Sequence, residues 1–357
     1  MPTKPDSYVA PPDVIRAAFA GSSPDDVTFL ARQCLELGAW DHALALCDAL
    51  GDGDAPGVEL CRAVARFVSG EAHAALAIVQ QVLERRPGHL SALAIQAQML
   101  ARSGDRDGAR RCLLELCARY PDYPGAHGLL STVLMPGPHY RDVLRALHER
   151  LRPRSYLEIG IETGATLALA AQAQTAVGVD PADYPVQHAL GPGTRIFREE
   201  SDGFFAAHRR EELFGSRRVD LAFIDGLHVF EQALRDFRNA ELWAHAGATI
   251  VLHDCVPILA RTAERVRSTK FWVGDTWKVV FALAALRPDL KIRSVLAPPS
   301  GLVVVRRLNP GSRVLFDRYD EAVERFAGLS WSAEVGDWPA ELGPVPNDER
   351  GLAEALS

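Results

Sequence analysis

Short apolar segments alternate with amphipathic helical segments between residues 155 and 254, and this alternation constrains the fold more than any other feature. Five segments are predicted to be β-strands because each is short, apolar and bounded by turn or helical residues. The stretches between them, such as 228–244, are predicted to be helical. Strands that alternate with helices form a parallel sheet with helices on both faces. The predicted strands cover residues 155–160, 176–180, 194–197, 219–225 and 248–254.

Two further strands are predicted after this region. Residues 291–296 and 301–308 flank a four-residue turn, which is typical of an antiparallel hairpin. We therefore predict an α/β domain over residues 140–310, with a parallel sheet that an antiparallel hairpin closes. Residues 311–357 are predicted to be a C-terminal helix and tail, to which we assign no function.

The first third of the chain repeats with a period of 34 residues. Gly70 and Gly104 are one period apart, and alanine and proline pairs follow the same spacing. This is the period of tetratricopeptide helix pairs, and the segment 23–135 resembles such repeats. We expect an all-α repeat domain there. Its function is either to bind a protein partner or a second copy of the chain, or only to pack as a helical appendage.

Composition and charge argue against several classes of protein. The 357-residue chain has a formal net charge of −7, which does not suit general nucleic-acid binding because that requires cationic contacts to phosphates. Its longest apolar run, 279–286, is much shorter than a membrane span. Residues 1–22 are predicted to be an N-terminal extension without a signal-peptide pattern. We expect a cytoplasmic protein with free thiols, no zinc site, and no nucleic-acid or membrane partner.

A glycine-containing turn follows the first predicted strand. Glu158, Gly160 and Gly164 form the pattern E-x-G-x-x-x-G, and such a turn lets the backbone approach a ligand at a helix N-terminus. A dinucleotide site needs a second glycine at position 162. Position 162 is a glutamate here. Its carboxylate would repel a pyrophosphate but is compatible with the cationic methionine group of a sulfonium cofactor. The turn therefore disfavours a nicotinamide oxidoreductase and resembles the loop of S-adenosylmethionine-dependent methyltransferases.

The ends of the second and third strands offer groups for an adenosine moiety. Asp180 ends the second strand, where a carboxylate can accept hydrogen bonds from both ribose hydroxyls, although it could be an ordinary strand-end carboxylate. The resemblance to the methyltransferase fold implies that Ser201 and Asp202 contact the adenine edge. The same two residues are equally suited to cap the following helix.

Titratable side chains follow the fourth and fifth strands, where Asp225, His228, His253 and Asp254 stand. Because neighbouring strand ends meet at the carboxyl edge of a doubly wound sheet, we expect these four side chains to converge in one pocket. Two carboxylates and an imidazole can bind a divalent metal. A remaining histidine is a candidate general base. The alternative is structural, with His228 at a helix start and His253 in the core.

The pattern from Asp225 to Asp254 resembles the small-molecule O-methyltransferases grouped with macrocin-type sugar methyltransferases, and catechol-type enzymes share its layout. The resemblance implies a Rossmann-like class I methyltransferase fold, S-adenosylmethionine as cofactor, Asp225 as a magnesium ligand and His228 as the base on an acceptor hydroxyl. The second acidic pair of the sugar enzymes maps to His253 and Asp254. The Asp-Asn pair of the catechol type maps to Asp254 and Cys255, so one oxygen ligand is missing in either mapping.

This departure leaves two forms of the site open. Magnesium prefers oxygen ligands, whereas manganese or iron would tolerate His253. A metal-free site would use His228 or His253 alone as the base.

The segment 270–283 offers groups for a sugar-like acceptor, or else is an amphipathic helix that packs on the core. Its acceptor candidates are Trp272, Asp275, Trp277 and Lys278.

The sequence as a whole predicts an S-adenosylmethionine-dependent O-methyltransferase that acts on a hydroxyl of a sugar or related polar small molecule, with or without Mg²⁺ or Mn²⁺. The competing hypothesis is a non-catalytic interaction protein, in which the repeats bind a partner and the methyltransferase-like domain is degenerate. The altered metal pair supports the second hypothesis. The intact turn at Gly160 and Gly164, together with Asp180, opposes it.

Overall fold

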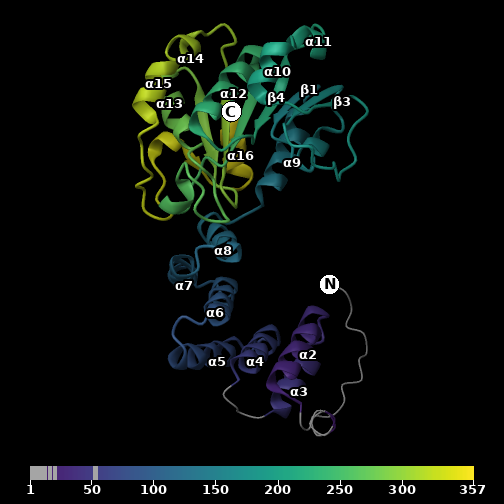
Figure 1. The fold of residues 1–357 in the computed structure, drawn as a ribbon, viewed down its shortest axis with the longest axis vertical. Helices are drawn as coiled ribbons and strands as arrows, with labels where there is room; N and C mark the ends of the chain where they lie inside the picture. Colours follow the sequence, from purple (N-terminus) through teal and green to yellow (C-terminus); the bar gives the residue numbers. More distant parts are fainter. Residues whose placement is uncertain (1–13, 15–17, 19–21, 51–54) are drawn as a thin grey trace. The chain divides into compact units, whose positions relative to one another are not determined.

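The computed structural model describes residues 14, 18, 22–50 and 55–357. The chain divides into two units, residues 1–133 and 134–357, and each has its own hydrophobic core (Figure 1). The predicted N-terminal extension over residues 1–22 lies almost entirely outside the described residues.

The N-terminal unit is built from helices. Helices α4, α6 and α8 begin at a constant spacing of 34 residues, as do α5 and α7. Gly70 and Gly104 stand in the turns between helices with φ of 95° and 87°, a backbone region that favours glycine. The helical region is therefore present, while its assignment to the tetratricopeptide class stays a prediction. The helices are α2 (Pro24–Glu36), α3 (Trp40–Ala49), α4 (Pro56–Val68), α5 (Ala72–Arg85), α6 (Leu90–Arg102), α7 (Arg106–Arg119) and α8 (Pro124–Leu134).

The C-terminal unit is organised around an eight-stranded sheet of order β3-β2-β1-β4-β5-β7-β6-β8. The neighbours from β3 to β5 are parallel, and β7 is antiparallel to both β5 and β6. The predicted parallel sheet closed by an antiparallel hairpin is therefore confirmed. The strands are β1 (Ser155–Ile159), β2 (Thr175–Val179), β3 (Thr194–Phe197), β4 (Val219–Ile224), β5 (Ala244–His253), β6 (Lys291–Val295), β7 (Leu302–Arg306) and β8 (Pro344–Val345).

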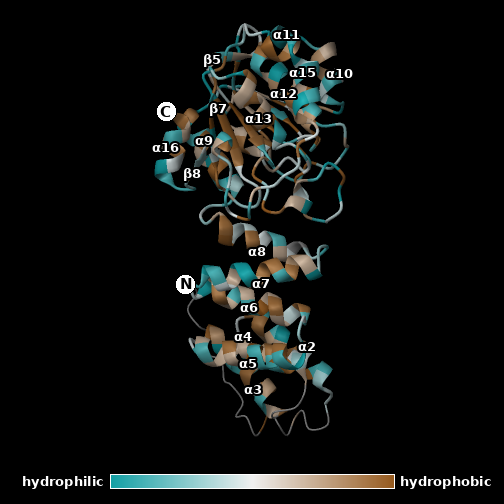
Figure 2. Cartoon of the chain, turned by 90° about the vertical axis from the view of Figure 1, so that its left-hand side faces the viewer, coloured by the Kyte–Doolittle hydropathy of each residue, from teal (hydrophilic) through white to brown (hydrophobic). Residues whose placement is uncertain are grey.

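Helices cover both faces of this sheet. Leu157 and Ile159 of β1 pack in the core on one face, whereas Tyr156 packs in the core on the other, as the two-residue period of a strand requires. In Figure 2 the strands are hydrophobic, and the flanking helices carry both hydrophobic and hydrophilic residues. One face holds α9 (Tyr140–Leu151), η1 (Leu167–Ala170) and α16 (Glu349–Leu356), and the other holds α10 (Ser201–Ala207), α11 (Arg210–Phe214), α12 (Phe230–Trp243), α13 (Lys278–Leu286) and α15 (Tyr319–Phe326).

The C-terminal tail is part of the sheet unit. β8 pairs in parallel with β6, and α16 buries Leu352 and Ala355 in the core beside α9. The sequence did not predict this strand because two residues are too short to show a periodic pattern. Residues 311–357 contain three α-helices where the sequence predicted one: α14 (Val314–Asp317), α15 and α16.

The strand order reverses between β1 and β4, and this places the candidate site. β1 pairs with both β2 and β4, so the loops that leave β1 and β4 begin next to each other. Ligands of open α/β sheets bind at such a switch point, outside the carboxyl ends of the strands. Among the described residues, no helix is both long enough and apolar enough to cross a membrane.

Candidate active site

A cavity of about 830 Å³ lies at the carboxyl ends of β1, β2, β4 and β5. It extends from the glycine-containing turn after β1 to the histidines and aspartates that follow β4 and β5. The structure therefore brings the predicted cofactor loop and the predicted catalytic residues to one space. The predicted site residues in its wall are Gly160, Asp180, Ser201, Asp225, His228, His253, Asp254 and Trp272.

The turn after β1 requires its two glycines. Gly160 has a φ of 85°, and a Cβ at this position would lie 2.0 Å from the backbone oxygen of Asp225. Gly164 has a φ of 81° and lies against Val186. The loops after β1 and β4 can approach each other closely only because position 160 has no side chain.

Glu158 supports this turn from behind rather than lining the cavity. Its side chain is fully buried and accepts hydrogen bonds from Tyr156 Oη and Thr166 Oγ1, both at 2.6 Å. Glu158 therefore has no place in the cavity wall, where the sequence predicted a contact with the cofactor. Burial raises the pKa of Glu158 to about 8, although both hydrogen bonds lower it.

The raised pKa of Glu158 predicts a pH-dependent stability. Above about pH 4.5 the unfolded chain releases a proton that the folded chain retains up to about pH 8, so raising the pH favours unfolding in this window. In this window the unfolding free energy of the unmodified chain should fall as the pH rises. Glu158→Gln stays neutral, so its unfolding free energy should fall less steeply, by up to about 1.4 kcal/mol per pH unit. Urea unfolding of both proteins between about pH 5 and about pH 8 measures this difference. Parallel pH profiles for the two proteins would contradict it.

Asp180 fastens the end of β2 to the turn after β1. Its Oδ2 accepts the N–H groups of Ile161 at 2.9 Å and Glu162 at 2.8 Å, and its Oδ1 accepts the N–H of Ala182 at 2.9 Å. A carboxylate has about four acceptor positions, so one stays available to a ribose hydroxyl. Asp180 is thus more than an ordinary strand-end residue, because it fixes the shape of the loop.

The structure separates the two residues expected at the adenine edge. Ser201 lines the cavity and donates a hydrogen bond to the buried Asp236 at 2.6 Å. Asp202 does not line the cavity. It is exposed and pairs with Arg235 at 2.9 Å, so the sequence prediction for it needs correction. Glu200, directly before Ser201, lines the cavity instead.

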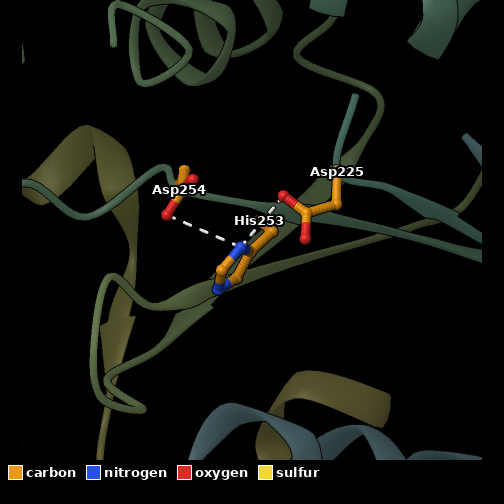
Figure 3. Close-up of side chains that lie close together, drawn as sticks. All are labelled: Asp225, His253 and Asp254. Atoms are coloured by element: carbon orange, nitrogen blue, oxygen red, sulfur yellow. Dashed lines mark hydrogen bonds and ion pairs between the residues drawn. The ribbon is translucent and has the colours of Figure 1, made fainter. Parts of the chain in front are cut away.

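Four side chains form a compact network where β4 and β5 end. His253 Nδ1 lies 3.1 Å from Asp225 Oδ1 and 3.5 Å from Asp254 Oδ1 (Figure 3). His228 Nε2 lies 3.1 Å from Asp254 Oδ2 and 3.5 Å from Asp225 Oδ1. The predicted convergence of these residues therefore occurs, with each histidine close to both carboxylates.

The charges within this network shift the pKa values of its own members. Burial alone would lower the pKa of His228, but the charges of Asp254 and Asp225 outweigh it and raise the pKa to about 9. The pKa of His253 is raised by the same two carboxylates against the effect of its burial. Burial would raise the pKa of Asp225, but the two histidines hold it well below its usual range. At neutral pH the carboxylates thus keep a proton on His228, and this must be lost before His228 can act as a base.

Two residues that the sequence analysis missed hold His253 and Asp254 in place. The ring of Tyr140 in α9 packs against the His253 ring at a tilt of 31°, with 4.1 Å between centroids. Ser300, in the turn between β6 and β7, donates a hydrogen bond to Asp254 Oδ1 and lies 3.3 Å from His253 Nε2. No local pattern marked either residue, because each stands on an element distant in sequence from the strand that it supports.

Asp225, His253 and Asp254 also provide a donor set for a metal ion, since one ligand atom from each lies within 4.8 Å of the others. Two carboxylates and one imidazole fit Mn²⁺ or Fe²⁺ better than Mg²⁺. Cys255 is buried and its Sγ lies 3.2 Å from the backbone oxygen of His253, so the structure favours His253 over Cys255 as the third donor.

The predicted acceptor segment contributes one residue to the cavity wall. Trp272 stacks on His228 with 5.4 Å between centroids. Asp275, Trp277 and Lys278 are buried beneath it, where Asp275 accepts a hydrogen bond from Lys278 at 3.1 Å and Trp277 packs on Trp331. The prediction that these three contact an acceptor is therefore corrected, because they stabilise the start of α13 within the core.

Comparison with known proteins identifies the unit that contains this cavity. Residues 157–255 match a family model described as a methyltransferase domain. The C-terminal unit contains a methyltransferase domain. The match spans the strands from β1 to β5 and all four residues of the histidine–aspartate network, and it confirms the prediction of a methyltransferase.

Several solved structures resemble the domain, although at low identity. A putative O-methyltransferase from Klebsiella pneumoniae is 13% identical over 51% of this chain and 88% of that chain, with a TM-score of 0.38. The TomG O-methyltransferase of Streptomyces achromogenes, solved in complex with SAM, is 17% identical over 48% and 80%, with a TM-score of 0.39. An O-methyltransferase from Bacillus cereus, solved in complex with SAH, is 15% identical over 55% and 89%, with a TM-score of 0.37. No curated protein matches the chain.

Proposed function

We propose that this protein transfers a methyl group from S-adenosylmethionine to a hydroxyl of a sugar or related polar small molecule. The observation that carries the proposal is the shared cavity, in which the turn at Gly160 faces the same space as the histidine–aspartate network. A donor held by the turn and an acceptor held by the network would meet there. Alignment of two bound reactants is the main source of rate enhancement in such a transfer.

His228 is the proposed general base. It lines the cavity, and its Nε2 faces Asp254 and Asp225, which would stabilise the imidazolium formed when it takes the acceptor proton. His228 can accept that proton only when it is neutral, and the two carboxylates oppose this state. Trp272 covers the His228 ring and offers an aromatic surface to a sugar-like acceptor.

Asp225, His253 and Asp254 would hold a divalent metal. A bound metal would polarise the acceptor oxygen and offset the negative charge that keeps His228 protonated. Without a metal, His253 stays paired with Asp225 and helps to neutralise the cluster. The donor set supports Mn²⁺ or Fe²⁺ more than Mg²⁺.

Calorimetric titration of the full chain with S-adenosylmethionine and S-adenosylhomocysteine tests the proposal. We expect micromolar binding of both ligands, because the cavity wall offers charged and backbone groups for an adenosine and an amino acid. A titration with Mn²⁺, repeated on Asp225→Asn, tests the metal site, and a heat signal lost in the variant supports it. Absence of binding by both adenosyl ligands, with and without Mn²⁺, would contradict the enzymatic proposal and favour a degenerate domain.

A further inference from the structure

Two buried cysteines of neighbouring helices lie against each other in the N-terminal unit. Cys47 stands near the end of α3 and Cys61 stands within α4, and both belong to one small cluster of buried apolar side chains. Arg62 holds the two helices together at this point, because its Nη2 donates to the Cys47 carbonyl at 2.7 Å and its Nε donates to Asp48 at 2.9 Å. The packing therefore fixes two thiols close together on separate helices.

The two thiols interact directly, and the interaction makes them unequal. A hydrogen bond between them is the main cause of both the raised pKa of Cys47 and the lowered pKa of Cys61. Burial opposes the lowered pKa of Cys61, but the charge of Arg32 in α2 and a hydrogen bond from it lower this pKa further. Cys61 is thus the thiol that ionises first, and a thiolate is the form of cysteine that reacts.

The other cysteines do not share this arrangement. Each of them has a pKa raised chiefly by burial, which keeps an isolated thiol protonated and unreactive. These cysteines are Cys34, Cys112, Cys117 and Cys255. All six cysteines of the chain lie within the described residues, and Cys61 is the one whose pKa is lowered.

The helical repeat shows that packing does not require cysteine at these two positions. Cys47 is the eighth residue of α3, and Cys61 is the sixth residue of α4. The two later helix pairs carry aliphatic residues at both equivalent positions. These are Val79 in α5 and Leu113 in α7 for Cys47, and Ile95 in α6 and Leu129 in α8 for Cys61. Thiols that replace aliphatic side chains at both positions of one pair indicate a chemical role.

We propose that Cys47 and Cys61 form a reversible disulfide that links α3 to α4, with a small disulfide such as oxidised glutathione as the oxidant. The Cys61 thiolate attacks one sulfur of the small disulfide, which forms a mixed disulfide and releases one thiolate. Cys47 then loses its proton and attacks the Cys61 sulfur, which forms the bond between the helices and releases the second thiolate. The two released thiolates take up the two protons that the cysteines lose, so the small disulfide is reduced to two thiols.

The structure also assigns the order of these two steps. The Cys61 side chain keeps 5% of its surface exposed, whereas Cys47 is fully buried, so an external disulfide meets Cys61 first. The contact between the thiols then places Cys47 beside the mixed disulfide. This inference does not depend on the proposed function, because both cysteines lie in the unit that does not contain the cavity.

Oxidised glutathione added to the reduced, folded full chain tests the inference. The readout is peptide mapping without reduction after cleavage at acidic residues, since Glu59 stands between the two cysteines. We expect the peptide with Cys47 to be linked to the peptide with Cys61, and dithiothreitol to restore both thiols. Cys47→Val should instead retain glutathione on Cys61, because the thiol that displaces it is gone. Arg32→Met should slow the first step by about threefold or more, because less Cys61 is then ionised.

The control variants preserve the packing of the helices. Cys47→Val and Cys61→Ile introduce the residues of the next helix pair, and Cys61→Ile should leave Cys47 reduced. Cys112→Ser is the matched control, since Cys112 is a partly exposed thiol of the same unit, and it should form the link as the unmodified chain does.

Three results would overturn the inference. In the first, glutathione accumulates on Cys34 or Cys112 while Cys47 and Cys61 stay reduced. In the second, the link forms only after urea unfolds the chain, which would show that the folded helices do not support the bond. In the third, Cys47 gains glutathione in Cys61→Ile as fast as Cys61 does in Cys47→Val, which would remove the assigned order of attack.

Discussion

Replacing His228 by alanine should lower turnover by about 10² to 10⁴-fold, the usual contribution of a general base. The ring lines the cavity, and its Nε2 lies 3.1 Å from Asp254 Oδ2 and 3.5 Å from Asp225 Oδ1. Among the described residues, the other histidine close to both carboxylates is His253, whose side chain is more buried than that of His228. The rate of S-adenosylhomocysteine formation, with an acceptor that the unmodified chain methylates, measures the effect.

Donor affinity distinguishes loss of the base from loss of the fold. His228 lies on the loop after β4, whereas the turn that would hold the donor follows β1, so S-adenosylhomocysteine should bind His228→Ala nearly as tightly as the unmodified chain. His245→Ala is the control, because His245 pairs with Asp220 at 3.1 Å at the opposite end of β5. Full turnover in His228→Ala would remove His228 from the mechanism and direct attention to His253.

Replacing Gly160 by alanine should abolish donor binding and destabilise the C-terminal unit. The added Cβ would lie 2.0 Å from the Asp225 backbone oxygen, and the φ of 85° is itself unfavourable for alanine. The loops after β1 and β4 must then move apart, which separates the donor turn from the histidine–aspartate network. Calorimetry with S-adenosylhomocysteine and urea unfolding measure the two effects.

Gly215→Ala isolates the cost of the backbone conformation. Gly215 also has a positive φ, of 60°, but a Cβ there would meet no atom within 4 Å. It should cost about 1–3 kcal/mol of unfolding free energy and leave donor binding intact. Gly160→Ala should exceed this by about 1–3 kcal/mol, the usual cost of overpacking. Equal destabilisation by the two substitutions, with donor binding retained in both, would show that the loops do not need their close approach.

The sequence determined the architecture of the C-terminal unit because its patterns are local. A strand with both faces buried needs a short apolar run, and a helix needs apolar residues at helical spacing, so each element was visible within a few residues. The carboxyl ends of β4 and β5 meet at one edge of the sheet, which is why Asp225, His228, His253 and Asp254 could be assigned to one pocket.

Several site residues could not be found in this way. Tyr140 and Arg141 line the cavity from α9, and Ser300 contacts Asp254 from the turn after β6. No spacing within the sequence links these elements to β4 or β5. The error at Asp202 has a related cause. Neighbouring positions of a helix point in different directions, and only the packing of α10 on α12 decides that Ser201 faces the cavity while Asp202 pairs with Arg235.

The chemistry available at the strand ends was thus determined by the sequence alone, since it depends on which titratable residues follow which strand. The tertiary structure decided which of those residues share the cavity, as the burial of Asp275, Trp277 and Lys278 shows. It also decided how far their charges interact, because the pKa of His228 depends on distances of 3–4 Å to carboxylates on two different loops. Such distances arise only when separate elements pack together, and no local pattern encodes them.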